Sequence, residues 1–279
     1  MKSSIIDSIK SLPPLSKTII DINRVYADEE ASINELAKVI EPDPMIVANL
    51  LKSANSPLYG FGREIHSVVQ AVSLFGMSMT RSIALGNSVR KLLNVDMKPY
   101  GITSDEFAHI SSMQATLMLK WYGKIDRSKA DKLYLAAFLQ ETGKILISSD
   151  IIQEDEGTSF QSEIENTNNI AQVEKSYVEV SSSEVTAEVF SHWGFDKEFV
   201  NMIKYADNPS AAPEEIQEYS IALNIIKTVL PMNKPFSEQS INFGLRKARD
   251  AGYEYEFLED AIDSMLDVIE KTEGSENNS

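Results

Sequence analysis

Apolar residues recur along this chain at the three- and four-residue spacing of helices. The segment "MIVANLLKSAN" shows the pattern clearly, because its apolar positions share one helical face: Ile46, Val47, Leu50, Leu51 and Ala54. Asp43 and Pro44 precede it, and an N-cap followed by proline at the first helical position is a typical helix start. We find no convincing two-residue alternation of the kind that half-buried strands show. The pattern predicts an all-α protein.

Capping boxes mark three further helix starts, at Ser32–Glu35, Thr103–Glu106 and Ser181–Glu184. They predict a short helix from residue 33, a long helix over about 104–122, and a helix that ends near Trp193 and Gly194. Further helical segments are predicted at about 196–206, 213–231, 237–252 and 255–271. There are no internal repeats.

Three segments break this helical pattern. Residues 148–175 are polar and acidic without a clear period, which predicts a long loop or a weakly ordered insert. The segment "DMKPYGITSDEF" is punctuated by proline and glycine and suggests a domain boundary near residue 100. The tail "EGSENNS" is predicted to be disordered.

Composition narrows the chemistry. The chain has 279 residues, of which 43% are hydrophobic, and this is enough for a sizeable core. It has no cysteine, which excludes disulfides, a thiol nucleophile and a zinc site built on sulfur. Residues 1–11 lack the features of a signal peptide, and apolar runs such as 133–139 are too short to span a bilayer. We expect a soluble cytoplasmic protein without a membrane partner.

The net charge of −16 is unevenly distributed. Residues 1–100 hold 11 Lys/Arg and 10 Asp/Glu, whereas residues 101–279 hold 15 Lys/Arg and 32 Asp/Glu. An acidic surface repels the phosphate backbone of nucleic acids at long range. Nucleic acid is therefore an unlikely partner for the C-terminal part, and nothing in the charge of the N-terminal part favours it.

The segment "LPPLSKTIIDINRVYADEEASINELAKVIEPDPMIVANLLKSANSPLYG" resembles the start of the bacterial HDOD domain. This family is a signal-transduction relative of the HD-superfamily metal-dependent phosphohydrolases. The resemblance continues through "SVVQAVSLFGMSMTRSIAL" and, less densely, to about Pro209. It implies an N-terminal helical bundle (1–100) packed on a degenerate HD-like helical bundle (101–209). Residues 210–279 would supply C-terminal helices that complete the fold.

The resemblance also locates the positions at which an HD enzyme carries its metal ligands. A working site needs several imidazoles and carboxylates around one or two divalent ions. Here those positions fall on residues that include no histidine: Ile110, Gln140, Glu141, Ser182, Ala206 and Asp207. Only Glu141, Asp207 and, after a slip in register, His109 could still reach a metal. We therefore expect no metal and no cofactor.

Each of these residues also has a plain structural explanation. His109 fits a partly exposed helix position, and Glu141 with Lys144 fits a surface ion pair. Ser182 can help to open a helix, and Asp207 before Asn208-Pro209 suits a turn. His66 fits a structural position at a helix start, and Trp193 beside His192 fits a core position.

The leading hypothesis is a non-catalytic regulatory module that binds a protein partner in bacterial signal transduction. A residual metal-dependent phosphodiesterase or nucleotide binder that uses Glu141 and Asp207 is the alternative. A second alternative is nucleic-acid binding by the N-terminal bundle, since "LFGMSMTRSIALGNSVR" is similar to a helix-turn-helix with Arg81 and Arg90 as phosphate contacts. The apolar residues of that segment favour core packing instead: Ile83, Leu85 and Val89.

Overall fold

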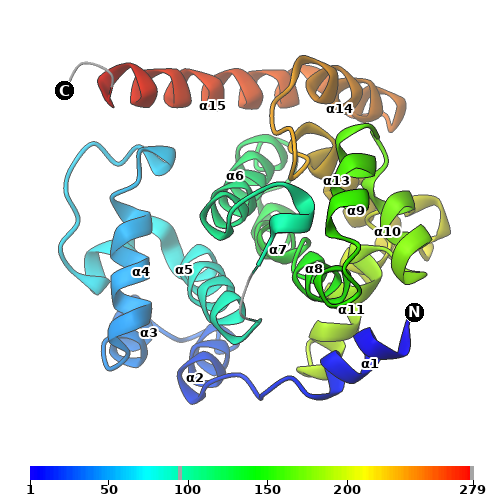
Figure 1. The fold of residues 1–279 in the computed structure, drawn as a ribbon. Coiled ribbons are helices and arrows are strands. Elements are labelled where there is room, and N and C mark those ends of the chain that lie inside the picture. The colour runs from blue at the N-terminus through cyan, green and yellow to red at the C-terminus, as the bar shows by residue number, and fades with distance from the viewer. Residues whose placement is uncertain (94–95, 277–279) are drawn as a thin grey trace.

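A computed structural model describes residues 1–93 and 96–276, and within these ranges the chain forms helices and no strands. The N-terminal part of the fold is a bundle of four helices and one short 3-10 turn (Figure 1). Their bounds are α2 (Lys17–Tyr26), α3 (Ile33–Ile40), α4 (Pro44–Ala54), η1 (Pro57–Tyr59) and α5 (Val68–Leu93). Helix α5 packs on α2, α3 and α4, and it is broken at Gly76, whose φ of 75° lies outside the helical region.

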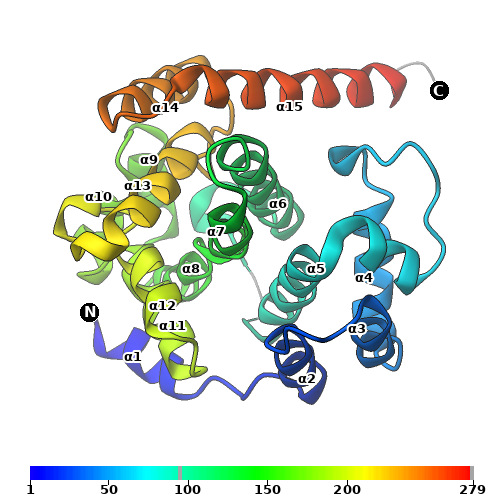
Figure 2. The same ribbon diagram turned by 180° about the vertical axis from the view of Figure 1, so that it is seen from behind.

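The central part of the fold is built around the antiparallel pair α6 (Ser104–Tyr122) and α7 (Arg127–Leu139), which follow the short turn η2 (Lys98–Tyr100). Helix α8 (Gly143–Gln153) packs on α11 (Ser182–His192), with α9 (Gly157–Glu165) and α10 (Ile170–Val178) beside it. Helix α12 (Lys197–Lys204) packs on α11 and α7 (Figure 2).

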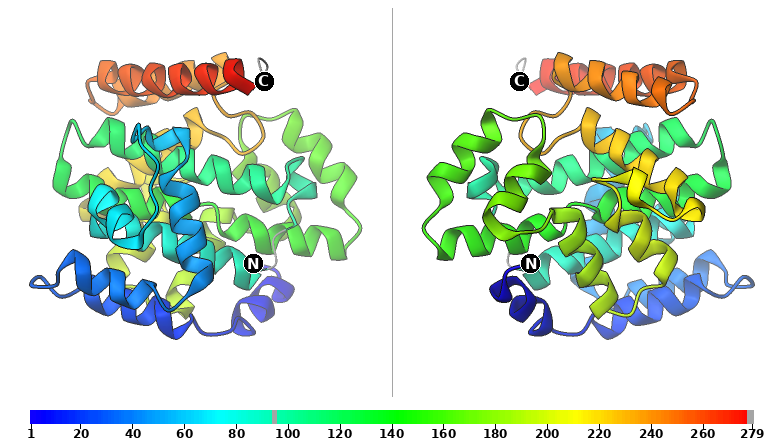
Figure 3. Two further views of the ribbon diagram at one scale, coloured as in Figure 1. Left: turned by 90° about the vertical axis from the view of Figure 1, so that its left-hand side faces the viewer. Right: turned by 90° about the vertical axis from the view of Figure 1, so that its right-hand side faces the viewer.

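The C-terminal helices complete this central bundle. After η3 (Pro209–Ala211), helix α13 (Glu214–Val229) packs on α6, α7 and α12. Helices α14 (Glu238–Asp250) and α15 (Tyr255–Glu276) lie across the opposite end of the molecule from α1 and α2 (Figure 3). Helix α15 contacts both α6 and η1, so it connects the central helices with the N-terminal bundle.

Helix α1 (Ser3–Lys10) packs on α8 and α11 and thus belongs spatially to the central helices (Figure 1). The domain boundaries at about residues 100 and 209 stay predictions. Because α1 comes first in the chain but packs on the central helices, the order of the chain does not match the grouping of the helices in space. Helix α15 extends to Glu276, beyond the expected end at Lys271. The last part of the predicted disordered tail, 277–279, lies outside the described residues.

The helix starts predicted from local sequence are confirmed. All three capping boxes form in both directions, with the hydroxyls of Ser32, Thr103 and Ser181 accepting backbone hydrogen bonds and the paired glutamates returning them. Asp43 caps α4, with Pro44 in its first turn. The all-α class is confirmed as well, because the described residues form helices and no strands. The helix starts were predictable because these caps are interactions within four residues and need no tertiary context.

The prediction of a loop over residues 148–175 is wrong. The segment contains the end of α8, all of α9 and most of α10. Apolar side chains hold the two short helices against the core, and all of these are buried: Phe160, Ile164, Val173 and Val178. Phe160 packs edge-on against Tyr100 and Tyr177, with ring centroids 5.2 and 5.1 Å apart. Tertiary packing thus orders helices whose own sequence is mostly polar.

Within the described ranges one helix, Val68–Lys91 in α5, is long and apolar enough to cross a membrane by length and composition. Half of its most apolar window is buried within the fold, and Gly76 interrupts it. Ile83, Leu85 and Val89 are buried, which confirms core packing for this segment. These features are typical of a core helix in a soluble helical domain.

Candidate functional site

The turn between α7 and α8 carries Gln140 and Glu141 into the interior of the central bundle. Both are buried, at 0% and 2% exposure. Gly143 opens α8 rather than simply ending α7, and its amide donates to Thr186 Oγ1 at 2.8 Å. A Cβ at Gly143 would meet the Ser182 carbonyl and lie 2.8 Å from the Thr186 amide nitrogen. Glycine therefore lets the turn sit directly against α11.

The interpretation of Glu141 and Lys144 as a surface pair is wrong. Lys144 is only 2% exposed, and its Nζ lies 3.3 Å from Glu141 Oε2. The expected i,i+3 pairing is present, but the first turn of α8 points into the bundle and not to solvent. A buried ammonium and a buried carboxylate must compensate each other's lost hydration.

A second carboxylate, Glu174 on α10, completes the surroundings of Lys144. Lys144 Nζ donates to Glu174 Oε1 at 2.5 Å and to Ser182 Oγ at 2.9 Å. Glu174 also accepts from the Ser182 amide at 2.6 Å and from the Tyr100 hydroxyl at 3.0 Å. Burial and the adjacent Glu174 carboxylate raise the pKa of Tyr100 well above its usual value, so the hydroxyl stays a donor.

A second lysine, Lys227 on α13, neutralises the other side of the cluster. Its Nζ lies 2.7 Å from Asp207 Oδ1 and 3.8 Å from Glu141 Oε2, and it donates to Ser183 Oγ at 2.9 Å. Asp207 does lie in a turn, after α12, and it also accepts from the Ser183 amide at 3.4 Å.

The charges of these groups are fixed by their neighbours. Burial alone would raise the pKa of Asp207, but the ammonium groups of Lys227 and Lys144 outweigh it and hold that pKa below its usual range. Burial acts against the charged lysines, but the carboxylates around them raise the pKa of both Lys144 and Lys227. Both lysines therefore remain cations at neutral pH.

Two glutamines occupy the innermost part of the cluster. Gln140 Nε2 donates to Gln114 Oε1 at 2.9 Å, and Gln114 Nε2 donates to the Leu230 carbonyl at 2.8 Å and to Glu141 Oε1 at 3.3 Å. Gln114 lies one helical turn beyond Ile110 on α6. Ile110 is buried but aliphatic, so Gln114 is the residue of α6 that meets Gln140 and Glu141.

The structure thus brings four of the sequence-predicted positions together: Gln140, Glu141, Ser182 and Asp207. Ala206 is buried next to Asp207, and its carbonyl accepts from Asn224 at 2.6 Å. That these are the vestigial ligand positions of an HD site stays a prediction.

The three histidines lie away from this cluster. His109 is exposed and lines a separate cleft together with Arg90, and burial of part of its ring lowers its pKa. His66 lies 3.7 Å from Glu64 on the surface, and His192 is exposed at the end of α11. Trp193 is partly buried, and its indole donates to the Pro13 carbonyl at 3.0 Å.

The donor set does not fit the di-metal centre of an HD enzyme. Within the described residues, no group of three or more histidine, cysteine, aspartate or glutamate side chains is arranged to hold a metal ion. The three carboxylates of the cluster are instead interleaved with two ammonium groups. A divalent cation entering here would meet Lys144 and Lys227 at the positions next to Glu141 Oε2.

Sequence reasoning missed three residues of the cluster: Gln114, Glu174 and Lys227. Glu174 lies in residues 148–175, whose polar sequence predicts a loop. Lys227 lies beyond the part of the chain that resembles a known family. A charged residue on an otherwise apolar helix face was the available signal, since Lys227 lies between the buried residues Ile226 and Val229.

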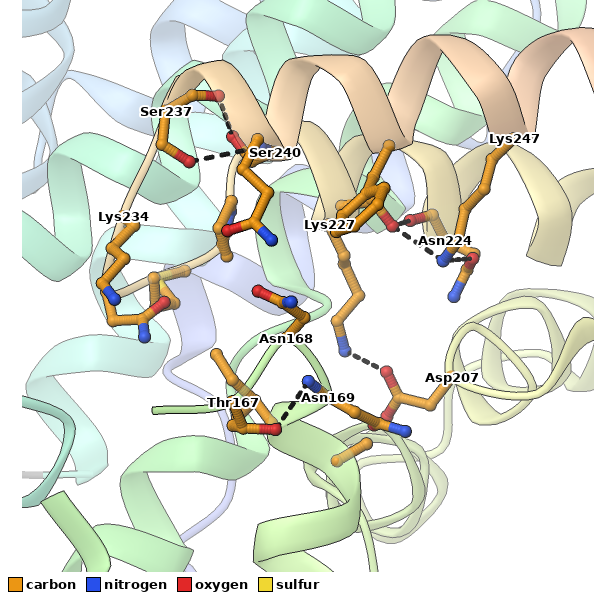
Figure 4. A pocket seen from close by; sticks show the side chains of 18 of the residues that line it. Thr167, Asn168, Asn169, Asp207, Asn224, Lys227, Lys234, Ser237, Ser240 and Lys247 are labelled. Atoms are coloured by element: carbon orange, nitrogen blue, oxygen red, sulfur yellow. Dashed lines mark hydrogen bonds and ion pairs between the residues drawn. The ribbon is translucent and has the colours of Figure 1, made fainter. Parts of the chain in front are cut away.

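The cluster forms the floor of a pocket of about 360 Å³ that opens between the α9–α10 connection, α13 and α14 (Figure 4). Asn168 and Asn169 lie on one side, and Lys234, Ser237 and Lys247 lie on the other.

The HDOD domain family matches residues 12–209. A curated relative from Treponema pallidum (strain Nichols), described as an uncharacterized protein, is 23% identical over 221 residues. The matched region covers 77% of this chain and 41% of that relative, so the chain spans about two fifths of the relative's length.

Solved structures share the fold. A virulence factor from Campylobacter jejuni subsp. jejuni is 25% identical with a TM-score of 0.56, over 92% of this chain and 93% of that chain. A protein from Marinobacter aquaeolei VT8, provisionally named a signal transduction protein, is 20% identical with a TM-score of 0.69, over 96% of this chain and 60% of that chain. The second likeness shows the fold alone.

The family match spans most of the chain, and its residues carry the helical bundles described above. This chain belongs to the HDOD domain family, whose fold is related to that of the HD superfamily.

Proposed function

We propose that this chain is a non-catalytic regulatory module of bacterial signal transduction that acts in the cytoplasm by binding a protein partner. In this proposal a lysine–carboxylate network has taken the place of the metal centre. The observation that carries it is the pair of ammonium groups, Lys144 and Lys227, held within 3.8 Å of Glu141 Oε2.

The network removes two requirements of metal-assisted hydrolysis. Metal catalysis needs carboxylates that are free to coordinate and an open position for water. Here Glu141 and Asp207 are compensated by lysines, and Gln140 donates its amide to Gln114. Displacing either lysine would leave an uncompensated charge in the bundle, at a cost of about 3–5 kcal/mol.

The distribution of exposed apolar side chains supports a protein partner. Large hydrophobic residues are exposed at seven positions in the described chain, and four of them lie on α5 and on α2, α3 and α4, which pack against it: Ile20, Ile33, Met45 and Val69. Met45 is 55% exposed and Ile20 is 47% exposed. A contiguous exposed apolar patch marks a protein-binding surface, and we propose that these four side chains contribute to one.

Two observations bear on the alternatives. Glu141 and Asp207, the residues of the phosphodiesterase alternative, are each held by an ammonium group. Arg81, the residue of the nucleic-acid alternative, donates to Asn23 Oδ1 at 2.6 Å and stacks over the Tyr26 ring at 4.6 Å. Its guanidinium is therefore engaged in packing α5 on α2.

Hydrolysis of bis(4-nitrophenyl) phosphate with added Mn²⁺, Mg²⁺ or Fe²⁺ tests the loss of catalysis. We expect no metal-dependent turnover and no stoichiometric metal retained after gel filtration. Turnover that Glu141→Gln abolishes would contradict the proposal, provided that Asp263→Asn, at an exposed position on α15, retains it.

Affinity capture from a native bacterial lysate tests the partner. The double variant Ile20→Asp/Met45→Asp should lose specific proteins that the wild type retains. Ile152→Asp is the matched control, because Ile152 is also exposed (44%) but lies on α8 in the central bundle. Identical protein profiles for the wild type and the folded double variant would contradict binding through this surface.

A further inference from the structure

We infer that the pocket above the lysine–carboxylate network binds a small phosphorylated ligand, which it recognises through cations of the C-terminal helices. This inference rests on the proposed non-catalytic function and deepens it, since a ligand that is bound without being hydrolysed can act as a regulatory signal. The cations that carry it, Lys234, Arg246 and Lys247, lie outside the residues that match the family, 12–209.

The rim of the pocket holds three cations, Lys234, Arg246 and Lys247. Among the ion pairs of the described residues, none involves Lys234, Arg246 or Lys247. Lys247 donates to Asn224 Oδ1 at 2.7 Å and to Thr228 Oγ1 at 2.9 Å, and Lys234 donates to the Glu165 carbonyl at 2.7 Å. Neutral oxygens thus position these lysines without cancelling their charge.

Arg246 is the most available of the three cations. It is exposed on α14, and its guanidinium carbon lies 4.9 Å from the centre of the Phe243 ring. Phe243 also lines the pocket. A cation held over an aromatic ring keeps its outward hydrogen-bond donors free for an anion.

The charge balance of the pocket favours an anion. The network beneath the pocket has a formal charge of −1, from the carboxylates of Glu141, Asp207 and Glu174 and the ammonium groups of Lys144 and Lys227. With the three rim cations, the network and the pocket together have a formal charge of +2. This excess stands out on a chain whose net charge is −16.

Neutral polar groups complete a surface suited to phosphate oxygens. The walls offer side-chain amides and hydroxyls from Thr167, Asn168, Asn169 and Ser237 (Figure 4), and Asn233 and Gln239 also line the pocket. Lysine and arginine with converging amide and hydroxyl donors are the usual means by which proteins hold phosphate. Phe243 and Met232 provide apolar surface for the remainder of the ligand.

The volume of about 360 Å³ limits the size of the ligand. Pockets of roughly 300–1,000 Å³ hold ligands of metabolite or drug size. The pocket therefore suits a compact molecule such as a nucleoside monophosphate or a sugar phosphate, and a nucleic-acid strand is excluded by size.

Isothermal titration calorimetry tests the inference with four phosphate-bearing probes and with the unphosphorylated counterparts of three of them. The probes are inorganic phosphate, AMP, GMP and glucose 6-phosphate, and the counterparts are adenosine, guanosine and glucose. We expect at least one phosphorylated probe to bind and its counterpart to bind about tenfold or more weakly, because a charge-assisted hydrogen bond accounts for roughly that factor.

Arg246→Gln and the double variant Arg246→Gln/Lys247→Gln test the site. Each removed cation should weaken binding about tenfold. Arg249→Gln is the matched control, since Arg249 is exposed on the same helix but does not line the pocket. Among the described residues, the guanidinium of Arg246 packs on the Phe243 ring and makes no hydrogen bond, so the single variant should fold even where the double variant is destabilised.

The inference is overturned if none of the phosphorylated probes binds, or if Arg246→Gln and Arg249→Gln bind them equally. Binding followed by release of inorganic phosphate would instead contradict the proposed non-catalytic function. If the probes are neither bound nor hydrolysed, the inference of a phosphorylated ligand is overturned but the proposed non-catalytic function is not. The two failures are therefore distinguishable.

Discussion

The ammonium nitrogen of Lys227 lies 2.7 Å from Oδ1 of Asp207 and thereby ties α13 to the turn that follows α12. The same nitrogen lies 3.8 Å from Glu141 Oε2, at the turn between α7 and α8. One lysine from the C-terminal helices thus compensates two carboxylates of the central bundle. The network is therefore as much a structural element as a candidate site.

Lys227→Met should destabilise the protein by about 3 kcal/mol, because it leaves the Asp207 carboxylate without its nearest counter-charge in a nearly dehydrated position. Urea unfolding at pH 7 measures the change. Lys132→Met is the control, since Lys132 makes an exposed ion pair of 2.9 Å with Glu198, and such surface pairs contribute about 0–1 kcal/mol. Equal losses for the two variants would contradict the prediction.

Protonation of the Asp207 carboxylate should account for part of the loss of stability in acid. The folded-state pKa of Asp207 is held below its usual value, so its contribution is present above about pH 4 and is lost as the pH falls toward the folded-state pKa. Unfolding free energies between pH 7 and pH 3 should therefore decline more steeply for the wild type than for Asp207→Asn. Asp263→Asn, at an exposed position, should keep the wild-type slope. Parallel wild-type and Asp207→Asn profiles would contradict this assignment.

Gly143→Ala should destabilise the protein by about 1–3 kcal/mol, because the added methyl group would overlap the Ser182 carbonyl and the Thr186 backbone. Thermal unfolding followed by circular dichroism measures the effect. Gly157→Ala provides the matched comparison, since a Cβ there meets nothing within 4 Å in the first turn of α9. We expect it to be neutral or to stabilise by up to about 1 kcal/mol. A Gly143→Ala variant as stable as Gly157→Ala would show that α8 and α11 can separate at no cost.

The local features of the fold were predictable from sequence because they depend on neighbouring residues. The hydroxyl of Thr103 and the carboxylate of Glu106 form a capping box three residues apart, and the sequence alone reveals it. Helices α9 and α10 were not predictable in this way. Each has nine residues, and a few buried side chains such as Phe160 and Val173 hold them only through contacts with distant elements.

Only some positions of the candidate site were predictable from the sequence, and its charge balance was not. Gln140 and Glu141 were expected at the site on the strength of the family resemblance, and the structure places them in its interior. The pairing of Glu141 with Lys144 was also expected, but i,i+3 spacing carries no information about burial. Glu174 lies 30 residues from Lys144 along the chain and Lys227 lies 20 residues from Asp207, and one sequence does not reveal either pairing.

Arg81→Ala should lower stability by about 1–2 kcal/mol and leave nucleic-acid binding unchanged. The substitution removes the hydrogen bond to Asn23 Oδ1 and the stacking on Tyr26, both of which pack α5 on α2. Arg63→Ala, at an exposed position in the loop after η1, is the control for stability. A mobility shift with duplex DNA that persists at physiological salt and is lost in Arg81→Ala would instead support the nucleic-acid alternative.

Phe160→Ala tests whether residues 157–178 are an integral part of the fold. Phe160 is fully buried between the rings of Tyr100 and Tyr177. Removing its ring should lower the free energy of unfolding by about 3–5 kcal/mol and should increase hydrogen exchange in α9 and α10. Ile152→Ala is the control, because Ile152 is exposed on the preceding helix and should change stability by less than about 0.5 kcal/mol. The loss of protection should extend to Glu174, since α9 and α10 pack on each other and Glu174 lies on α10. If α9 and α10 exchange rapidly in the wild type and Phe160→Ala leaves stability unchanged, the segment is the loosely held insert that its polar sequence suggests.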